Sequence, residues 1–379
     1  MMQGGEEMGL KNLENLKFVD ANPEEMEIHI LEIVEGLLER KLARADPLRL
    51  FLLGVETMLI QQRLLFDQAA KMNLLAFARR GYLDHIGALV GTERLPASPA
   101  TTTMRLALSA VREQAVIIPK GARITAGDNI YFALSENAVI PAGELSVTAS
   151  ATCTENGERG NGYLPGEISR IVDPVPFWAA AENTTKSEGG ADVEGDDHYR
   201  ERIHEAPEKF STAGPTLAYE YHAKAASALI ADVSVDSPAP GEVVVHPLLK
   251  GGVIPGEEIL AIVREKLNDR RIRPLTDKVS VKAPESVKYG VDAVYYIDRS
   301  HATEAAAIQS RAENAVQEFV LWQKERLGRD INPTELYYRL RAAGVKRAEI
   351  KSPVFTKTEK NQVAIADHVK VTFGGLEDE

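Results

Sequence analysis

A long apolar helical pattern that ends near Gly81 is the feature that most constrains how this chain folds. Asp46 and Pro47 supply an N-cap and a first-turn proline, and Gly81 is suited to end a helix. A helix over residues 47–80 would be about 50 Å long, from the rise per residue of an α-helix. Its apolar residues are Leu48, Phe51, Leu52, Val55, Met58, Leu59, Leu64, Leu65, Phe66, Met72, Leu75 and Phe77. They cover more than one narrow stripe, so one partner helix cannot bury them all.

A shorter helix is predicted just before it. Asn22, Pro23 and two glutamates form its start, and the pattern runs toward Arg44. A hairpin of these two helices still leaves much of the wide stripe exposed. We therefore expect a bundle shared with other chains, although downstream domains of the same chain are an alternative cover. The residues expected at the partner interface are Ile28, Leu31, Leu38, Leu52, Val55, Leu59 and Phe66.

The pattern changes at Pro96 to short alternating apolar runs, which are typical of β-strands. Residues 118–121 and 140–143 read Ile-Pro-Lys-Gly and Ile-Pro-Ala-Gly. Proline in the second position and glycine in the fourth predict two type I turns. An acidic stretch rich in glycine, 183–197, predicts a domain boundary.

Helical and strand patterns alternate after this boundary, which predicts two small α/β units. We expect helices over 196–210, 215–228, 257–268, 303–326 and 333–344, and strands over 230–235, 242–246, 289–297 and 345–350. A helix, a strand, a Ser-Pro turn and another strand recur in both units, which suggests related modules. The expected fold class is multidomain α+β, with N-terminal long helices, a β-rich middle domain, and two small α/β C-terminal domains. The expected domains are a tail at 1–20, a bundle-forming helical segment at 21–95, the β-rich domain at 96–185, and α/β domains at 186–283 and 284–379.

Composition and charge narrow the class of protein. The 379 residues carry a formal net charge of -12, from 44 Lys plus Arg against 56 Asp plus Glu, which opposes binding to a phosphate backbone. Cys153 is the only cysteine, so an intramolecular disulfide and a multi-cysteine zinc site are excluded. Residues 1–18 lack the apolar core of a secretory signal, and the run 48–65 is too polar to cross a bilayer. We expect no nucleic-acid partner and no membrane insertion.

The motifs that resemble binding sites each have a simpler structural interpretation. The glycines of 156–162 loosely resemble a phosphate loop, but Pro165 and Gly166 interrupt any helix after them, which favours a turn. His198 and His204 are six residues apart, so they do not share a helix face as a metal pair at spacing i, i+4 does.

Catalytic interpretations have even less support. Glu155 and Glu158 are candidates for glycan cleavage but lie among turn residues, and Cys153 has no positioned partner. The carboxylates of 188–197 do not follow the order of calcium ligands. Three arginines in 270–273 could contact an anionic surface, although a solvated loop or an ion-paired interface is the simpler interpretation. We expect no catalytic site, no metal and no cofactor.

A series of short motifs follows in a distinctive order along the chain. They are 82–87 (Tyr-Leu-Asp-His-Ile-Gly) with Gly91 and Arg94, 118–121 with Phe132, Gly160-Asn161, 189–192 (Gly-Gly-Ala-Asp), 199–203 (Tyr-Arg-Glu-Arg-Ile), 211–215 (Ser-Thr-Ala-Gly-Pro) with Tyr219, and 273–277 (Arg-Pro-Leu-Thr-Asp). Each is unspecific alone, but their order resembles that of the baseplate J-like family, wedge proteins of contractile phage tails, tailocins and related contractile injection systems. The structural residues of the resemblance are Gly87, Gly91, Pro119, Gly121, Gly190, Asp192, Tyr199, Arg200, Gly214, Pro215, Arg273 and Pro274.

The resemblance implies a structural wedge protein and not an enzyme. It implies N-terminal helices that join wedge proteins in a bundle, and C-terminal domains that link neighbouring protomers. The implied partners are other baseplate wedge proteins, tail hub or sheath-initiating proteins, and further copies of the chain around the tail axis. The implied location is the baseplate of a virion or tailocin tail, assembled in the host bacterial cytoplasm. The alternatives are a tail-associated cell-wall glycan hydrolase and a glycan-binding module.

Overall fold

The computed structural model describes residues 13–210 and 216–378. The chain forms two compact units, which we describe separately. The first contains the residues up to Arg94 together with Tyr199–His204, and the second contains Leu95–His198 and the residues from Glu205 onward. Helices dominate the first unit, whereas the second combines three larger sheets with helices. The expected multidomain α+β class is confirmed.

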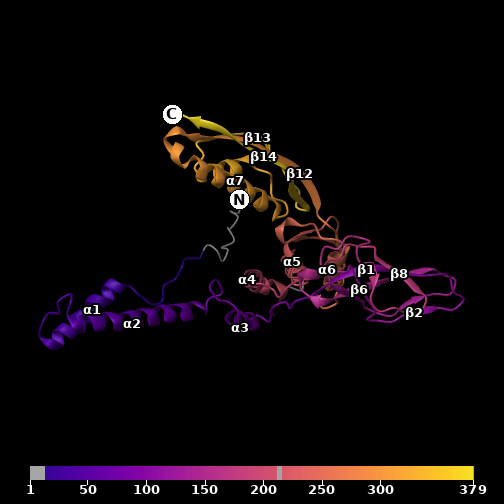
Figure 1. Ribbon diagram of the computed structural model, residues 1–379, viewed down its shortest axis with the longest axis horizontal. Coiled ribbons are helices and arrows are strands. Elements are labelled where there is room, and N and C mark those ends of the chain that lie inside the picture. Colours follow the sequence, from indigo (N-terminus) through magenta and orange to yellow (C-terminus); the bar gives the residue numbers. More distant parts are fainter. Residues whose placement is uncertain (1–12, 211–215, 379) are drawn as a thin grey trace. The chain divides into compact units, whose positions relative to one another are not determined.

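The first unit begins with two helices, α1 (Pro23–Leu38) and α2 (Pro47–Lys71), which lie side by side (Figure 1). Both begin where the sequence predicts. The side chains of Asn22 and Asp46 each accept a hydrogen bond from the second backbone N–H of their helix, at 3.1 and 2.9 Å. Proline occupies the first position of both helices, where no N–H is needed.

The first helix ends earlier than the sequence predicts. It stops at Leu38 and does not continue toward Arg44, because Glu39 adopts a left-handed conformation with a φ of 50°. The Glu35 carboxylate then accepts a hydrogen bond from the backbone N–H of Leu42 at 2.8 Å. This contact holds the chain as it turns toward the second helix.

The single helix predicted over 47–80 is wrong. The second helix ends at Lys71, and α3 (Gly81–Leu89) begins at the glycine that was expected to close it. The side-chain amide of Asn73 donates to two carbonyl oxygens of the last helical turn, both at 3.2 Å. The Arg200 guanidinium binds two carbonyl oxygens of the segment that follows, at 2.9 and 2.8 Å. This break depends on a residue far along the chain, so the local pattern could not reveal it.

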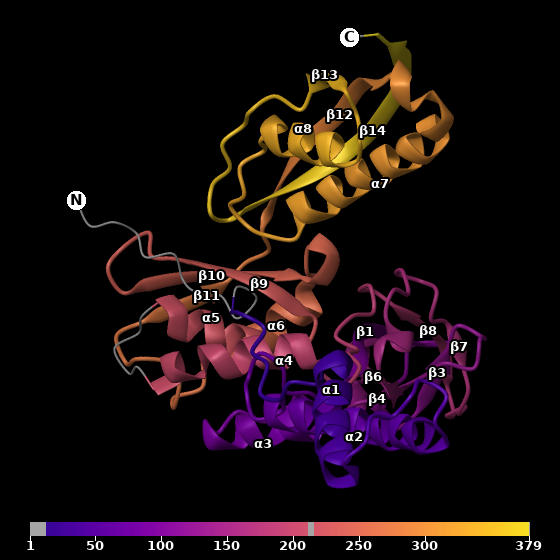
Figure 2. The same ribbon diagram turned by 90° about the vertical axis from the view of Figure 1, so that its left-hand side faces the viewer.

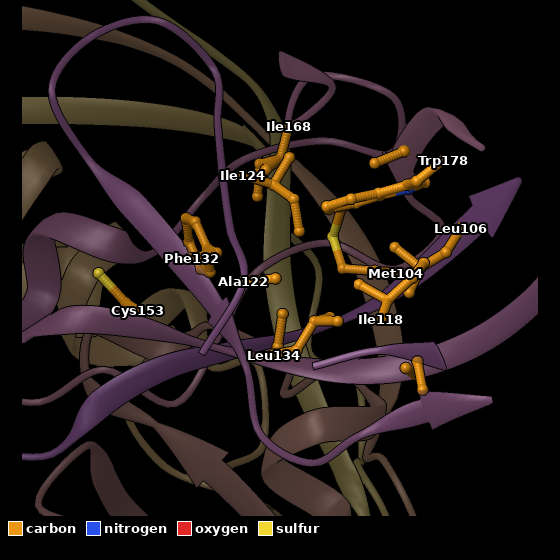
Figure 3. Packing of buried hydrophobic residues seen from close by; sticks show 14 of the residues in the cluster. Met104, Leu106, Ile118, Ala122, Ile124, Phe132, Leu134, Cys153, Ile168 and Trp178 are labelled. Atoms are coloured by element: carbon orange, nitrogen blue, oxygen red, sulfur yellow. The ribbon is translucent and has the colours of Figure 1, made fainter. Parts of the chain in front are cut away.

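The second unit begins with a β-rich domain. Its strands are β1 (Pro99–Leu108), β2 (Val116–Ile118), β3 (Arg123–Thr125), β4 (Tyr131–Leu134), β5 (Ala138–Ile140), β6 (Ser146–Asn156), β7 (Arg170–Ile171) and β8 (Trp178–Asn183). Six of them form one sheet in the order β7-β3-β4-β6-β1-β8, and β2 pairs with β5. Alternate residues of β1 are buried, as the pattern predicts. Side chains from several strands, including Met104, Ile124, Phe132 and Trp178, face one shared core (Figure 3).

Two turns in this domain lie one residue later than predicted. The hydrogen-bonded turns are 119–122 and 141–144, where the last N–H donates to the proline carbonyl at 3.2 and 3.1 Å. Gly121 and Gly143 therefore occupy the third position, with φ values of 84° and 86°. The predicted type I turns are wrong, because a positive φ at the third position is the mark of type II and requires glycine.

A small α/β domain follows. Before it comes α4 (Asp196–Glu205), of which Tyr199–His204 belongs to the first unit. The elements of the domain itself are α5 (Thr216–Lys224), β9 (Ile230–Asp236), β10 (Glu242–Leu249), α6 (Glu257–Leu267) and β11 (Lys278–Val281). The central strand β10 is antiparallel to β9 and parallel to β11. Val245, Ile259 and Val263 are fully buried in its core.

The C-terminal domain also consists of helices and a three-stranded sheet, but its strands are connected in a different order. Its elements are β12 (Glu285–Asp298), α7 (Ala305–Lys324), α8 (Pro333–Ala342), β13 (Arg347–Ser352) and β14 (Gln362–Glu377). Figure 2 shows α7 and α8 over one face of the sheet, whose order is β13-β12-β14. The two α/β domains share the predicted order of elements along the chain but not the arrangement of strands in the sheet. In the first domain β9 pairs with β10, whereas in the second β12 lies between β13 and β14.

Short 3-10 helices occupy Glu158–Gly160, Ala206–Phe210, Lys250–Gly252 and Arg299–Glu304. Within residues 13–210 and 216–378, no helix is both long and apolar enough to span a membrane.

Candidate interaction surfaces

The hairpin of α1 and α2 presents a broad apolar surface within the first unit. The large apolar side chains of α2 that are between 45% and 67% exposed are Leu50, Phe51, Met58, Leu59, Leu64, Leu65 and Phe66. Ile28, Ile33, Leu37 and Leu38 add exposed apolar area on α1. Met26 and Glu56 are the buried residues within the two helices. An exposed apolar area of this extent is typical of a protein interaction site.

The seven residues predicted at the partner interface divide into two groups. Four of them, Ile28, Leu38, Leu59 and Phe66, are exposed. The other three, Leu31, Leu52 and Val55, are half-buried. The exposed group is free to contact a partner without unpacking the hairpin, whereas the half-buried group also contributes to the hairpin itself.

The segment before α1 lies along α2, which the sequence gave no signal to predict. The Asp67 carboxylate accepts hydrogen bonds from the backbone N–H groups of Phe18 at 2.7 Å and Val19 at 3.3 Å. Arg63 donates to the carbonyl of Asp20 at 2.9 Å. Three apolar side chains of this segment, Leu13, Leu16 and Phe18, are about half exposed. They enlarge the apolar surface of the hairpin.

Three of the motif residues meet where α3 packs against residues 199–204. Tyr199 is buried, and its hydroxyl donates to the carbonyl of Thr92 at 2.7 Å. A Cβ atom on Gly87 would lie 2.0 Å from that hydroxyl oxygen, so only glycine fits there. Arg200 donates to the carbonyls of residues 75 and 78, as described above. Gly91, with a φ of 61°, ends α3 close by.

The glycine-rich run near Gly157 is clamped by a second group of motif residues. The backbone N–H of Gly190 donates to the side-chain oxygen of Asn161 at 2.9 Å, and the Asn161 amide donates back to the Gly190 carbonyl at 2.7 Å. A Cβ on Gly190 would lie 2.3 Å from the Gly157 carbonyl oxygen. Asp192 accepts a long hydrogen bond from Glu158 N at 3.4 Å. These contacts make the run a packed turn and not a phosphate loop.

The remaining motif residues that the structure describes also serve local structure. Arg273 donates to the Asp277 carbonyl at 2.8 Å, and Pro274 begins the turn that ends at Asp277. The Tyr219 hydroxyl donates to the Asp277 carboxylate at 2.7 Å. Burial, together with this hydrogen bond, raises the pKa of Tyr219 above its usual range. Pro119 and Gly121 form the turn described above, whereas Gly214 and Pro215 lie outside the described residues.

The residues considered for catalysis are occupied in other ways. Glu155 forms an exposed ion pair with Arg159 at 3.1 Å. Cys153 is buried, and burial raises the pKa of its thiol. Both ring nitrogens of His198 are engaged, one with Glu194 at 2.5 Å and one with a backbone carbonyl at 2.8 Å. In the part of the chain that the structure describes, no group of three or more His, Cys, Asp or Glu is arranged to hold a metal ion.

The C-terminal domain also presents a surface suited to protein contact. Tyr338 on α8 is 69% exposed, and Val354 and Phe355 after β13 are exposed to a similar extent. A groove of about 460 Å³ lies beside Tyr338, and its lining includes Arg311 of α7 and Arg339 of α8. Exposed aromatic side chains beside arginines are enriched at protein interfaces.

Comparison with protein families covers most of the chain. Residues 53–101 match the Baseplate J-like N-terminal domain, 105–190 the Baseplate J-like protein barrel domain, 211–283 the Baseplate J-like central domain, and 294–372 the Baseplate J-like protein C-terminal domain. These matches follow one another in the order of the chain.

Two individual proteins are similar to this chain. Baseplate protein J of Escherichia phage P2 is 32% identical over 200 residues, which cover 52% of this chain and 65% of the relative. The match therefore spans just under two thirds of the relative's length. A chain in the cryo-EM structure of the anti-feeding prophage baseplate is 14% identical, with 90% of both chains covered and a TM-score of 0.38. The four consecutive domain matches, the phage P2 relative and the motif residues found at packed turns together place the chain in the Baseplate J-like family.

Proposed function

We propose that this chain is a structural wedge component of the baseplate of a contractile phage tail or tailocin. In this role its N-terminal helices join other wedge proteins in a shared helical bundle. Its C-terminal domain, residues 284–379, links neighbouring protomers around the tail axis. The helical segment 21–95 is then the joining domain, and 96–185 and 186–283 are the rigid domains between the two contact regions. Other wedge proteins and hub or sheath-initiating proteins are its partners, and assembly takes place in the host bacterial cytoplasm.

The observation that carries this proposal is the exposed apolar surface of the α1–α2 hairpin. Leu59 and Phe66 on α2 are 45% and 63% exposed although they are large and apolar. Fully burying one such side chain is worth about 1.5 to 3 kcal/mol, so several of them give an assembly a strong driving force. Family membership supports the same role, because the matched relatives are named for a baseplate.

The C-terminal part of the proposal is supported by a separate core and a separate exposed surface. The C-terminal domain buries its own cluster around Phe319 and Leu336. Its exposed Tyr338 and Phe355 lie outside that core. A domain with an internal core and exposed aromatic residues is suited to contact an identical neighbour in a ring.

The proposal is tested by asking whether a double variant of the chain, Leu59→Asp with Phe66→Asp, is incorporated into particles. Both positions are exposed, so the isolated chain is expected to keep its thermal unfolding midpoint. Incorporation into particles is expected to be lost, because two charges would be buried at the bundle contact. Sedimentation of particles from cells that express the variant measures incorporation. Gln61→Asp, another exposed position on α2, is the matched control and should assemble normally.

Two outcomes would count against the proposal. Normal incorporation of the double variant would show that the hairpin surface is not an assembly contact. A markedly lower unfolding midpoint of the isolated double variant would show that other domains of the same chain cover this surface. The variant Leu52→Asp with Leu59→Asp should also block assembly, but half-buried Leu52 makes it less selective between these outcomes.

A further inference from the structure

Glu56 is a buried carboxylate in the seam between α1 and α2. Its residue is 6% exposed, and no residue in the described ranges 13–210 and 216–378 donates a hydrogen bond to its side chain. Burial, and to a smaller extent the carboxylate of Glu27 on α1, raise the pKa of Glu56. The oxygens of its carboxylate are not among the unpaired atoms that are sealed from solvent, so a hydrogen-bond donor on a partner chain can reach them.

The cation beside this seam is already engaged. Arg49 donates to the Glu27 carboxylate at 2.8 Å and also approaches the Leu42 carbonyl at 3.4 Å. The seam therefore has two carboxylates for one guanidinium. The other cations of the hairpin that form ion pairs within the unit are Arg40 with Asp46, Lys41 with Glu35, and Lys71 with Asp67.

Helix α1 is acidic, and so is the seam between α1 and α2. Its sixteen residues, Pro23–Leu38, include five glutamates and no lysine or arginine. The exposed apolar residues Ile28, Ile33 and Leu37 lie on the same helix. A helix that covered α1 would meet both apolar and acidic side chains. A second α1 would bring further negative charge to this face, which opposes pairing of two α1 helices.

We propose that Glu56 and the acidic face of α1 receive an arginine or lysine side chain from an amphipathic helix of a different baseplate chain. This inference rests on the proposed function, because it names the chemistry of the partner at the hairpin surface. The cation supplies the missing hydrogen-bond donor to Glu56. Its neighbouring apolar residues cover the exposed side chains of α1. Glu56 thus selects a basic partner among the helices that could cover an apolar surface.

The test compares two Glu56 variants with a control in the full-length chain. Glu56→Gln keeps the shape of the side chain, and Glu56→Leu removes its polarity. For both, the isolated chain should unfold at the same or a higher temperature than the native chain, since neither variant removes a hydrogen bond within the described residues of the chain. Particle incorporation should fall at least about tenfold, because the partner's cation is left buried without its carboxylate. Glu32→Gln, at an exposed position of α1, should change neither quantity.

Selection for suppressors of Glu56→Lys then identifies the partner. The inference expects restored particles to carry an acidic substitution at an arginine or lysine of another baseplate chain. Suppressors confined to this chain would overturn it. Native-level incorporation of Glu56→Gln and Glu56→Leu would also overturn it, and so would a lower unfolding temperature of both isolated variants. Glu56→Leu could assemble normally while the double variant Leu59→Asp with Phe66→Asp does not. That result would support the bundle contact of the proposed function and overturn only the inference of a basic partner helix.

Discussion

Gly87 illustrates, at the scale of single residues, why the family motifs are structural. Replacement by alanine would place a Cβ atom 2.0 Å from the Tyr199 hydroxyl oxygen and 2.6 Å from the Thr92 carbonyl oxygen. Tyr199 is buried and the carbonyl belongs to the backbone, so neither can move freely. Gly87→Ala should therefore lower the free energy of unfolding by about 1 to 3 kcal/mol.

Denaturant unfolding followed by circular dichroism measures this effect, and Gly54→Ala is the control. Gly54 lies within α2, and a Cβ atom added to it would meet no other atom within 4 Å. Alanine should therefore stabilise that helix by about 0.5 to 1 kcal/mol. Equal effects of the two substitutions would contradict the packing role of Gly87.

His246 on β10 gives a prediction about pH. Burial, and then the nearby charge of Lys282, hold the pKa of His246 below its usual value of 6.5, although Asp236 and Glu285 oppose this shift. The unfolded chain therefore binds a proton more readily than the folded chain. The contribution of neutral His246 to the free energy of unfolding is therefore complete above about pH 6.5. It is lost as the pH falls from 6.5 toward the lower pKa of His246 in the folded chain. Calorimetry from pH 7.5 to 5.5 should show that His246→Gln weakens this loss, and an unchanged loss would exclude His246 as its source.

Asp67 is the residue that joins two elements, the segment before α1 and helix α2. It accepts hydrogen bonds from Phe18 N and Val19 N and forms an ion pair with Lys71 at 2.8 Å. Asp67→Ala should release residues 13–20 from α2 while leaving α2 helical. Hydrogen exchange is the measurement, with faster exchange expected at Phe18 and Val19 and little change at the centre of α2. Unchanged protection at Phe18 and Val19 would mean that other contacts hold the segment.

The starts of elements follow from local chemistry, and their ends often do not. Asn22 and Asp46 were predicted as caps because their side chains satisfy N–H groups within the same turn, and the structure confirms both. Asn332 likewise caps α8 through Thr334 N at 3.0 Å, and the Glu335 carboxylate of the first turn pairs with Arg339.

The errors in the ends of elements have two physical causes. The break after Lys71 depends on Arg200, which is distant in sequence, and the position of a turn depends on which residue takes a positive φ. The same limit applies to the candidate surface. The wide apolar stripe of α2 was visible in the sequence, but the burial of Glu56 and the contact of Asp67 with residues before α1 appear only once the helices are paired.

For the whole molecule, the separate core of residues 284–379 predicts the effect of a truncation. A chain that ends after Ala283 lacks the cluster around Phe319 and the exposed Tyr338. It keeps the α1–α2 hairpin, so it should still bind its N-terminal partners while failing to close a ring around the tail axis. Mass photometry and electron microscopy of assembled wedges measure both properties. Closed rings from the truncated chain would place the linking surface elsewhere.

The proposed function requires that this chain be built into a baseplate through its exposed helical hairpin. Cryo-electron microscopy of purified native tails tests it most directly. We expect several symmetry-related copies of the chain at the end of the tail, with Leu59 and Phe66 packed against helices of a neighbouring chain. Tails that lack the chain, or copies whose hairpin remains open to solvent, would contradict it.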